Sequence, residues 1–153
     1  MTEYKKPSLT VDIIIFNSYD TNKTVEKIDK NNENKFILIK RQNEPFKNHW
    51  AIPGGFVDYG ETVENAAIRE AKEETGIDIE LKKLLGVYSE PKRDPRDHTI
   101  TIVYLAIGNF EKIKAGSDAS DAEIYSFDDI KSMKIAFDHS KILMDVFNEV
   151  NRN

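Results

Sequence analysis

Residues 55–77 read GFVDYGETVENAAIREAKEETGI, and this stretch predicts the centre of the fold. Thr62 is a residue type that caps helix N-termini, and Gly76 stands where a left-handed residue commonly ends a helix. We therefore expect a helix over residues 62–75. Small apolar side chains recur along it at helical spacing, namely Val63, Ala67 and Ala71. Such a stripe favours close packing of this helix on a β-sheet.

Three glutamates lie beside the apolar stripe: Glu70, Glu73 and Glu74. Because successive helical residues turn by about 100°, the three carboxylates share an arc of roughly 100°. Carboxylates that converge next to a buried face repel one another, so a cation must compensate, and oxygen ligands suit Mg²⁺ or Mn²⁺. Arg69 lies four residues before Glu73 and can orient or partly neutralise it.

A solvated acidic helix face is the other interpretation of these glutamates, because glutamate prefers the protein surface. Two features weigh against it. The neighbouring alanines imply close packing, and glycines just upstream allow the backbone to approach a ligand or a metal ion closely. These glycines are Gly54, Gly55 and Gly60.

The same residues resemble the Nudix box without a departure. Gly55 is followed after five residues by Glu61, and after seven more by Arg69 and the rest of REAKEETGI. Seven fixed letters, each at about one position in fifteen, match by chance at about one start position in 10⁸. Upstream, WAIPG at residues 50–54 also resembles the family's approach to its catalytic loop.

This resemblance implies a metal-dependent hydrolase of nucleoside diphosphates linked to another moiety. It also implies a Nudix-type α/β/α sandwich, in which a mixed β-sheet carries a loop–helix–loop catalytic box. Arg69 is implied to hold the glutamates in register, and Glu61 to brace the loop. The implied Mg²⁺ or Mn²⁺ ligands are the Gly54 carbonyl and the side chains of Glu70, Glu73 and Glu74.

Bound divalent ions would bridge the two phosphates of the substrate and activate a water molecule for in-line attack. The family resemblance leaves the residue that accepts the proton open. Glu70 is one candidate, and an acidic residue of the later segment GSDASDAEIY is another. There Asp118 is our predicted base, beside Asp121 and Glu123, and an ordinary acidic turn is the alternative.

The rest of the chain predicts one α/β domain over residues 1–153, because no repeat or linker interrupts its mixed strands and helices. Residues 45–55 predict an ordered loop, and the polar residues 17–34 a long solvated hairpin connection. A helical turn near residues 128–133 and an amphipathic helix over residues 139–150 follow. The predicted strands are residues 11–16, 35–41, 77–81, 84–89, 99–107 and 123–127.

The segment YSEPKRDPRDHTITI at residues 88–102 bears on the substrate, because it concentrates positive charge in an acidic protein. Arg93, Arg96 and His98 of this segment, with Gly55, are our predicted substrate-binding residues, and a solvated charged turn is the alternative. Together with residues 116–127 and 135–139, the segment resembles the ADP-ribose pyrophosphatase branch of the family. That resemblance implies hydrolysis of ADP-ribose to AMP and ribose 5-phosphate.

Three aromatic side chains have two interpretations each. His139 stands at the start of the last predicted helix, where a charged ring is unfavourable, so we expect it to be neutral and to pack or to contact the adenine side of the substrate. Trp50 and Phe56 either stack on a base or belong to the core.

The amino-acid composition limits the classes of function and partner that this chain can have. The chain has 153 residues, 22 Lys and Arg against 27 Asp and Glu, a formal charge of −5 and no cysteine. The charge argues against a nucleic-acid partner, and the missing cysteines exclude disulfides and thiolate chemistry. The sequence has neither a signal-peptide pattern nor an apolar run that spans a bilayer, so we expect a cytoplasmic protein without a membrane partner.

Two further possibilities stay open at this point. The substrate can be a damaged nucleoside triphosphate, a dinucleoside polyphosphate or another nucleotide sugar, because the box defines the chemistry and leaves the leaving group undefined. Alternatively, the domain is a sensor that binds ADP-ribose without cleaving it, although the intact box favours an enzyme. A homodimer is also common in the family that this chain resembles.

Overall fold

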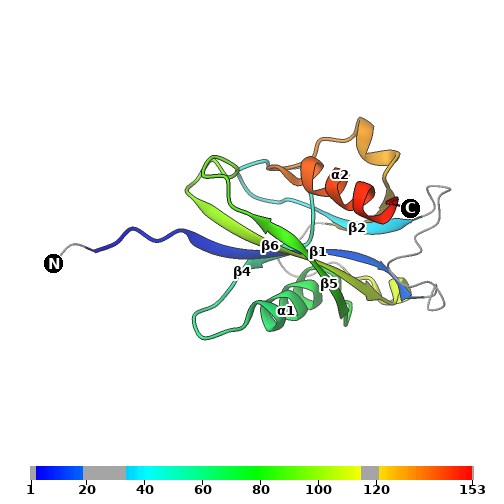
Figure 1. Ribbon diagram of the computed structural model, residues 1–153. Coiled ribbons are helices and arrows are strands. Elements are labelled where there is room, and N and C mark those ends of the chain that lie inside the picture. The colour runs from blue at the N-terminus through cyan, green and yellow to red at the C-terminus, as the bar shows by residue number, and fades with distance from the viewer. Residues whose placement is uncertain (1–2, 19–33, 115–120, 153) are drawn as a thin grey trace.

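One mixed β-sheet lies between two helices (Figure 1). The computed structural model describes residues 3–18, 34–114 and 121–152. The helices are α1 (Val63–Thr75) and α2 (His139–Val150), and two 3₁₀ turns cover Phe110–Lys112 and Asp129–Ser132. The strands are β1 (Ser8–Asn17), β2 (Lys35–Lys40), β3 (Trp50–Ala51), β4 (Gly54–Phe56), β5 (Glu80–Tyr88), β6 (Thr99–Gly108) and β7 (Asp121–Ser126). The predicted α/β/α sandwich with a mixed sheet is confirmed.

Strand β1 is the centre of the sheet and is covered on both faces. It pairs in parallel with β6 along its whole length, and β6 in turn pairs antiparallel with β5. Its side chains alternate between the two faces. Ile13 and Ile15 pack in the cluster beneath α1, whereas Ile14 and Phe16 pack in the cluster beneath α2. Burial on both faces explains why this strand reads as a continuous β-branched run.

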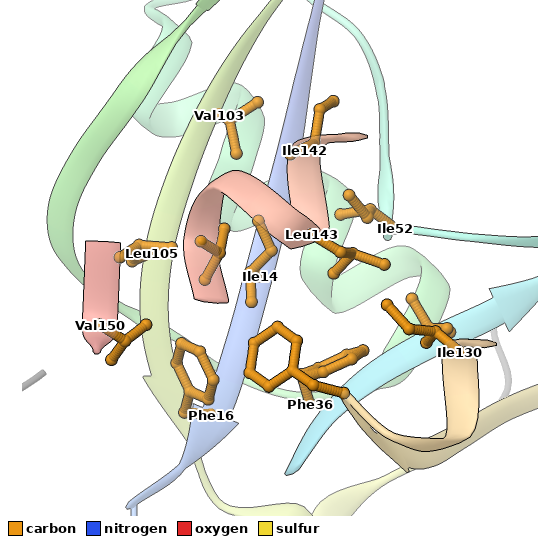
Figure 2. Packing of buried hydrophobic residues seen from close by; sticks show 13 residues of the cluster. Ile14, Phe16, Phe36, Ile52, Val103, Leu105, Ile130, Ile142, Leu143 and Val150 are labelled. Atoms are coloured by element: carbon orange, nitrogen blue, oxygen red, sulfur yellow. The ribbon is translucent and has the colours of Figure 1, made fainter. Parts of the chain in front are cut away.

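Helix α2 closes the larger of the two cores. Figure 2 shows Ile142 and Leu143 of this helix above Ile14 and Phe36 of the sheet, and all four side chains are fully buried. Rings of Phe36 and Phe127 meet at 4.8 Å between centroids. Because these buried residues come from both ends of the chain, the core joins the N-terminal strands to the C-terminal helix.

Helix α1 begins and ends where its sequence predicts. The Thr62 hydroxyl accepts a hydrogen bond from the Asn65 amide at 3.1 Å, and Gly76 has a φ of 78°. The Gly76 amide donates to the carbonyl of Lys72 at 2.9 Å. Both ends of the helix are therefore satisfied by side-chain or backbone groups, as a capped helix requires.

The sheet opens between β1 and β2. These two strands pair antiparallel at Phe16 and Phe36, whereas at their other ends each takes a different short partner. Strand β4 pairs with β1, and β3 pairs with the end of β2. Two adjacent strands that diverge leave a space between them, and the glutamates of α1 lie next to it.

Two secondary-structure predictions are wrong. Residues 45–55 contain β3 and β4, because this segment fills the space between the diverging strands and pairs with both. The two strands predicted at residues 77–81 and 84–89 are one strand, β5, with register shifts after Leu81 and Leu84. These register shifts interrupt the alternation of apolar side chains along the strand. The sequence pattern therefore predicted two strands where the structure has one bulged strand.

The predicted connection at residues 17–34 lies largely outside the described residues. The strands on either side of it, β1 and β2, are antiparallel neighbours, as a hairpin connection requires. The other predicted elements agree with the structure to within two residues at each end, apart from β1, which begins three residues earlier. Within the part of the chain that is described, no helix has the length and apolar character needed to cross a membrane.

Candidate active site

A cavity of about 320 Å³ lies where β1 and β2 diverge. Its lining comes from β1, β2, β3, β4, α1, the loop before β6 and the start of α2, so residues far apart in sequence meet there. The acidic lining residues are Asp12, Asp58, Glu70, Glu74 and Asp94. The basic lining residues are Arg41, Arg93 and Arg96. Carboxylates and guanidinium groups therefore share one small space.

Glu74 is the most unusual charged residue of this cavity. Its Oε2 atom is buried and has no hydrogen-bond partner among the described residues. Burial, together with the neighbouring Glu70 and Asp12, raises the pKa of Glu74 to about 9, against smaller opposing effects of the Gly54 backbone and Arg41. A buried carboxylate oxygen without a partner is costly, so this atom requires a proton or a cation.

Glu70 lies against the glycine loop that precedes α1. A Cβ atom placed on Gly55 would lie 2.5 Å from the Glu70 carboxyl carbon, so a larger residue there would displace the Glu70 carboxylate. Burial raises the pKa of the Glu70 carboxyl, although Arg69 partly opposes this. The glycine loop and Glu70 of α1 are therefore packed directly together.

Arg69 connects the loop before α1 to the helix. Its guanidinium donates to both Glu61 carboxylate oxygens, at 2.7 and 2.9 Å, and to the Phe56 carbonyl at 3.0 Å. It also donates to Glu70 at 2.8 Å and to Glu73 at 3.3 Å. The bonds to Glu61 lower the pKa of Glu61 to about 2, and the bonds to Glu61 and Glu70 raise that of Arg69. Arg69 therefore contacts Glu61 of the loop and two glutamates of the helix.

Glu73 differs from the other two glutamates. Its side chain is half exposed, is bonded to Arg69, and is not part of the cavity lining. Among the described residues, no three carboxylate or imidazole side chains come close enough together to hold a metal ion as they stand. The structure thus brings Glu70 and Glu74 to one cavity, with Gly54 beside them, and leaves Glu73 at its edge.

The oxygen atoms around Glu74 are suitable ligands for a divalent ion. The unpartnered Glu74 oxygen, the adjacent Glu70 carboxylate and the Gly54 backbone are oxygen donors of the kind that Mg²⁺ and Mn²⁺ prefer. A bound cation would replace the proton that a buried Glu74 otherwise holds.

Asp12 is a site residue that sequence reasoning missed. It is 7% exposed, accepts a hydrogen bond from the Thr101 hydroxyl at 2.6 Å, and lies 3.7 Å from Nε2 of His139. A Cβ atom on Gly54 would lie 2.5 Å from its Oδ1 atom. One signal was available, because Asp12 is the single acidic residue inside the apolar run VDIIIF.

His139 is buried beside the cavity and joins two parts of it. Its Nδ1 atom accepts from the Ile52 amide at 3.0 Å, so the neutral ring carries its proton on Nε2, which points toward Asp12. Burial lowers the pKa of the ring, although the nearby aspartates oppose this. This agrees with the predicted neutral ring, and its contacts are packing and positioning contacts.

The predicted substrate-binding arginines are both at the cavity, and each has a carboxylate partner. Arg93 forms two hydrogen bonds with Asp138, at 2.7 and 2.9 Å, and its side chain is 4% exposed. Arg96 forms two with Asp94, at 2.7 and 3.1 Å, and stays 44% exposed. Arg93 therefore fastens this loop to the start of α2, whereas Arg96 keeps access to the cavity and to solvent.

The remaining predicted residues lie in different places. His98 is not part of the cavity lining, and its Nε2 atom is 3.0 Å from the Ser89 carbonyl. Phe56 lines the cavity, whereas Trp50 packs against the core beneath α2 and meets the Tyr125 ring. Asp118 falls outside the described residues.

Arg41 and Phe137 also line the cavity, and the sequence analysis named neither as a site residue. The Arg41 guanidinium lies 4.8 Å from the centroid of the Phe137 ring. Burial and the neighbouring Arg96 lower the pKa of Arg41. No sequence signal marked this pair, because the two residues are 96 positions apart and neither belongs to the Nudix box.

Known proteins are similar to this chain over most of its length. A family model described as NUDIX domain matches residues 25–146. An ADP-ribose pyrophosphatase of Methanocaldococcus jannaschii is 53% identical over 113 residues, which cover 74% of this chain and 66% of that protein. An ADPR responsive transcriptional repressor NtrR of Acinetobacter baylyi is 31% identical over 153 residues, which cover 98% of this chain and 57% of that protein.

A solved structure is similar over nearly the whole chain. The NUDIX domain of Shewanella oneidensis NrtR, crystallised with ADP ribose, has a TM-score of 0.79 and 27% identity, and the match covers 97% of this chain and 91% of that one. This chain spans less than two thirds of the length of the two curated relatives above. Because the family model covers most of the sequence and the first relative is 53% identical over 74% of it, this chain belongs to the Nudix family.

Proposed function

We propose that this protein hydrolyses the pyrophosphate bond of ADP-ribose to AMP and ribose 5-phosphate, with Mg²⁺ or Mn²⁺ as cofactor. The observation that carries the proposal is the buried, unpartnered oxygen of Glu74 next to Glu70, in a cavity that also contains arginines. The carboxylates of Glu74 and Glu70 can bind a cation, and the arginines can bind a phosphate group. The 53% identity to a protein named ADP-ribose pyrophosphatase supports the substrate.

The proposed metal-binding residues are Gly54, Glu70, Glu73 and Glu74. When bound, the divalent ions supply charge neutralisation at the two phosphates and a more acidic water molecule. Arg69 holds Glu70 in place through its bond at 2.8 Å and ties α1 to Glu61 of the loop. Glu73 is also bonded to Arg69, so its half-exposed side chain would have to leave that hydrogen bond to reach an ion in the cavity. Glu70 and Asp118 remain the candidates for the base.

Substrate binding is assigned to Gly55, Arg93, Arg96 and His98. The Gly55 backbone lines the cavity beside Glu70, which places it where a phosphate can approach closely. Arg96 contributes a partly exposed guanidinium. Arg93 acts mainly by fixing the loop through Asp138, and His98 stays a prediction at the edge of this loop.

A binding domain that does not cleave ADP-ribose is the second candidate function. The similarity to a repressor named as ADPR responsive, and to a NUDIX domain crystallised with ADP ribose, favours it. The hydrogen-bonded set of Arg69, Glu61 and Glu70 next to Glu74 favours the enzyme, because a binding site needs no buried cluster of acidic groups. One Nudix domain over residues 1–153, a homodimer and a cytoplasmic location stay predictions.

Product analysis tests the proposed function. Purified protein would receive Mg²⁺ or Mn²⁺ and a panel of ADP-ribose, NADH, diadenosine polyphosphates, GDP-mannose and oxidised dGTP, followed by chromatography. AMP and ribose 5-phosphate from ADP-ribose, with little product from the others, is the expected result. Preference for another compound would refute the substrate and keep the chemistry. Binding of ADP-ribose without any cleavage would support the sensor instead.

A further inference from the structure

Arg41 is the basic residue of the cavity that has no carboxylate partner among the described residues. Its side chain makes one hydrogen bond there, from Nε to the Pro45 carbonyl at 2.8 Å. By contrast, Arg93 and Arg96 each make two hydrogen bonds to an aspartate. The terminal nitrogens of Arg41 are therefore still available to a ligand in the cavity that Arg41 lines.

The loop that follows β2 fixes the position of Arg41. Its backbone amide donates to the His49 carbonyl, and its carbonyl accepts from the Asn48 amide, both at 2.9 Å. The guanidinium is held from one edge by Pro45 and lies over the Phe137 ring at 4.8 Å. A guanidinium held in this way loses little conformational entropy when it binds an anion.

The surroundings of Arg41 indicate which charge the ligand carries. The Arg96 guanidinium lies 5.5 Å from the same Phe137 ring, so two cations share one aromatic side chain. The positive charge of Arg96 acts on Arg41, and so do the negative charges of Glu74, Asp94 and Glu44. Arg41 and Arg96 thus bring two positive charges to the cavity that also contains the metal-binding residues proposed above, an arrangement that suits an oxyanion.

We infer that Arg41, together with Arg96, binds a phosphate group of the nucleoside diphosphate substrate, and that Phe137 holds the two guanidinium groups in place. This inference rests on the proposed function for the identity of the ligand. The planar fork of Arg41 offers two terminal nitrogens to one phosphate, which Lys cannot reproduce. Arg41 is a binding residue in this account, and it takes no part in proton transfer.

Calorimetry on metal-free protein in EDTA tests the inference, with ADP-ribose and inorganic pyrophosphate as probes. Arg41→Ala should weaken the binding of both by about tenfold to hundredfold, because a charge-assisted hydrogen bond is lost. Lys47→Ala is the matched control, since Lys47 is an exposed cation of the same loop that does not line the cavity. Its affinity should stay within about twofold of wild type.

A second variant keeps the test decisive if Arg41→Ala does not fold. Arg41→Lys keeps the charge and most of the side chain, but loses the fork and the Nε bond to Pro45. A folded Lys variant should bind both probes at least about fivefold more weakly. Wild-type affinity in a folded variant, or wild-type protein that binds neither probe, would overturn the inference.

The hydrolysis assay separates this inference from the proposed function. If wild-type protein binds ADP-ribose through Arg41 but does not cleave it, the enzyme is refuted and the phosphate-binding role is retained. If wild-type protein cleaves ADP-ribose and Arg41→Ala binds it equally well, only the role of Arg41 is refuted.

Discussion

The charged side chains on two sides of the cavity differ in whether they have a partner within the protein. On the side formed by α1 and β4, the buried Glu74 carboxylate has an oxygen without a partner, and burial raises its pKa. On the side formed by the loop before β6, Arg93 and Arg96 are each paired with an aspartate. A charged side chain that is paired within the protein connects two parts of the fold. A buried charge without such a partner requires a bound ion, ligand or proton instead.

This comparison separates residues that hold a ligand from residues that shape the cavity. In our proposal Glu74 holds a ligand, whereas Arg93, which also lines the cavity, acts mainly by fixing the loop through Asp138. Arg41 resembles Glu74 in this respect, because its terminal nitrogens have no protein partner among the described residues.

Glu74→Gln should reduce kcat for ADP-ribose by about 1000-fold or more, because it removes a metal-binding charge and keeps the side-chain shape. The fold should persist, since the neutral amide replaces a carboxyl that is itself neutral without metal. Steady-state kinetics at saturating Mg²⁺, with circular dichroism as the control for folding, measure both. Unchanged turnover would refute the metal assignment.

Arg93→Ala should cost about 3 kcal/mol in the free energy of unfolding, because Asp138 loses its partner in a buried pair. Urea denaturation measures this loss.

Arg96→Ala is the matched comparison, because Arg96 is much more exposed. It should raise KM about tenfold with a smaller change in kcat, as expected for a binding group. Equal stability of both variants would mean that the two arginines have the same role.

Mn²⁺ should stabilise the wild-type protein against heat. At a metal concentration 100 times the dissociation constant, binding adds about 2.7 kcal/mol, which corresponds to a rise in Tm of about 5–10 °C in a chain of this size. Differential scanning fluorimetry with and without EDTA measures the rise. The same rise in Glu74→Gln would show that the ion binds elsewhere.

The metal-free protein should lose stability as pH rises. Unfolded Glu74 loses its proton near pH 4.5, whereas the folded carboxyl keeps it to about pH 9. Folding therefore binds a proton between these values, and the free energy of unfolding falls by up to about 1.4 kcal/mol per pH unit. Urea titrations from pH 5 to 9 should give a shallower fall for Glu74→Gln. Identical slopes would contradict the protonated Glu74.

The sequence predicted those parts of the site whose residues lie close together in the chain. The helix caps at Thr62 and Gly76 follow from residue type and spacing. The roles of Arg69 and Glu61 were implied by the resemblance to the Nudix box, and these residues too lie within one short stretch of the chain. The order of strands and helices indicated one α/β domain, and the resemblance to the Nudix box implied the α/β/α sandwich.

The residues that were missed depend on the topology of the sheet. Asp12 meets Thr101 because β1 and β6 are parallel neighbours, and these residues are 89 positions apart. His139 bonds to Ile52 across 87 positions. Sequence spacing carries no information about such contacts, which follow from the pairing of the strands and from the way that α2 closes over the sheet.

Direct measurement of Mn²⁺ binding tests the central claim, that the unpartnered Glu74 carboxylate is the partner of a divalent ion. Electron paramagnetic resonance at pH 7.5 would compare wild type, Glu74→Gln and the control Glu111→Gln, an exposed glutamate outside the cavity lining. We predict that Glu74→Gln weakens Mn²⁺ binding by more than about 100-fold while the control binds as wild type does. Equal affinity in all three proteins would contradict the account.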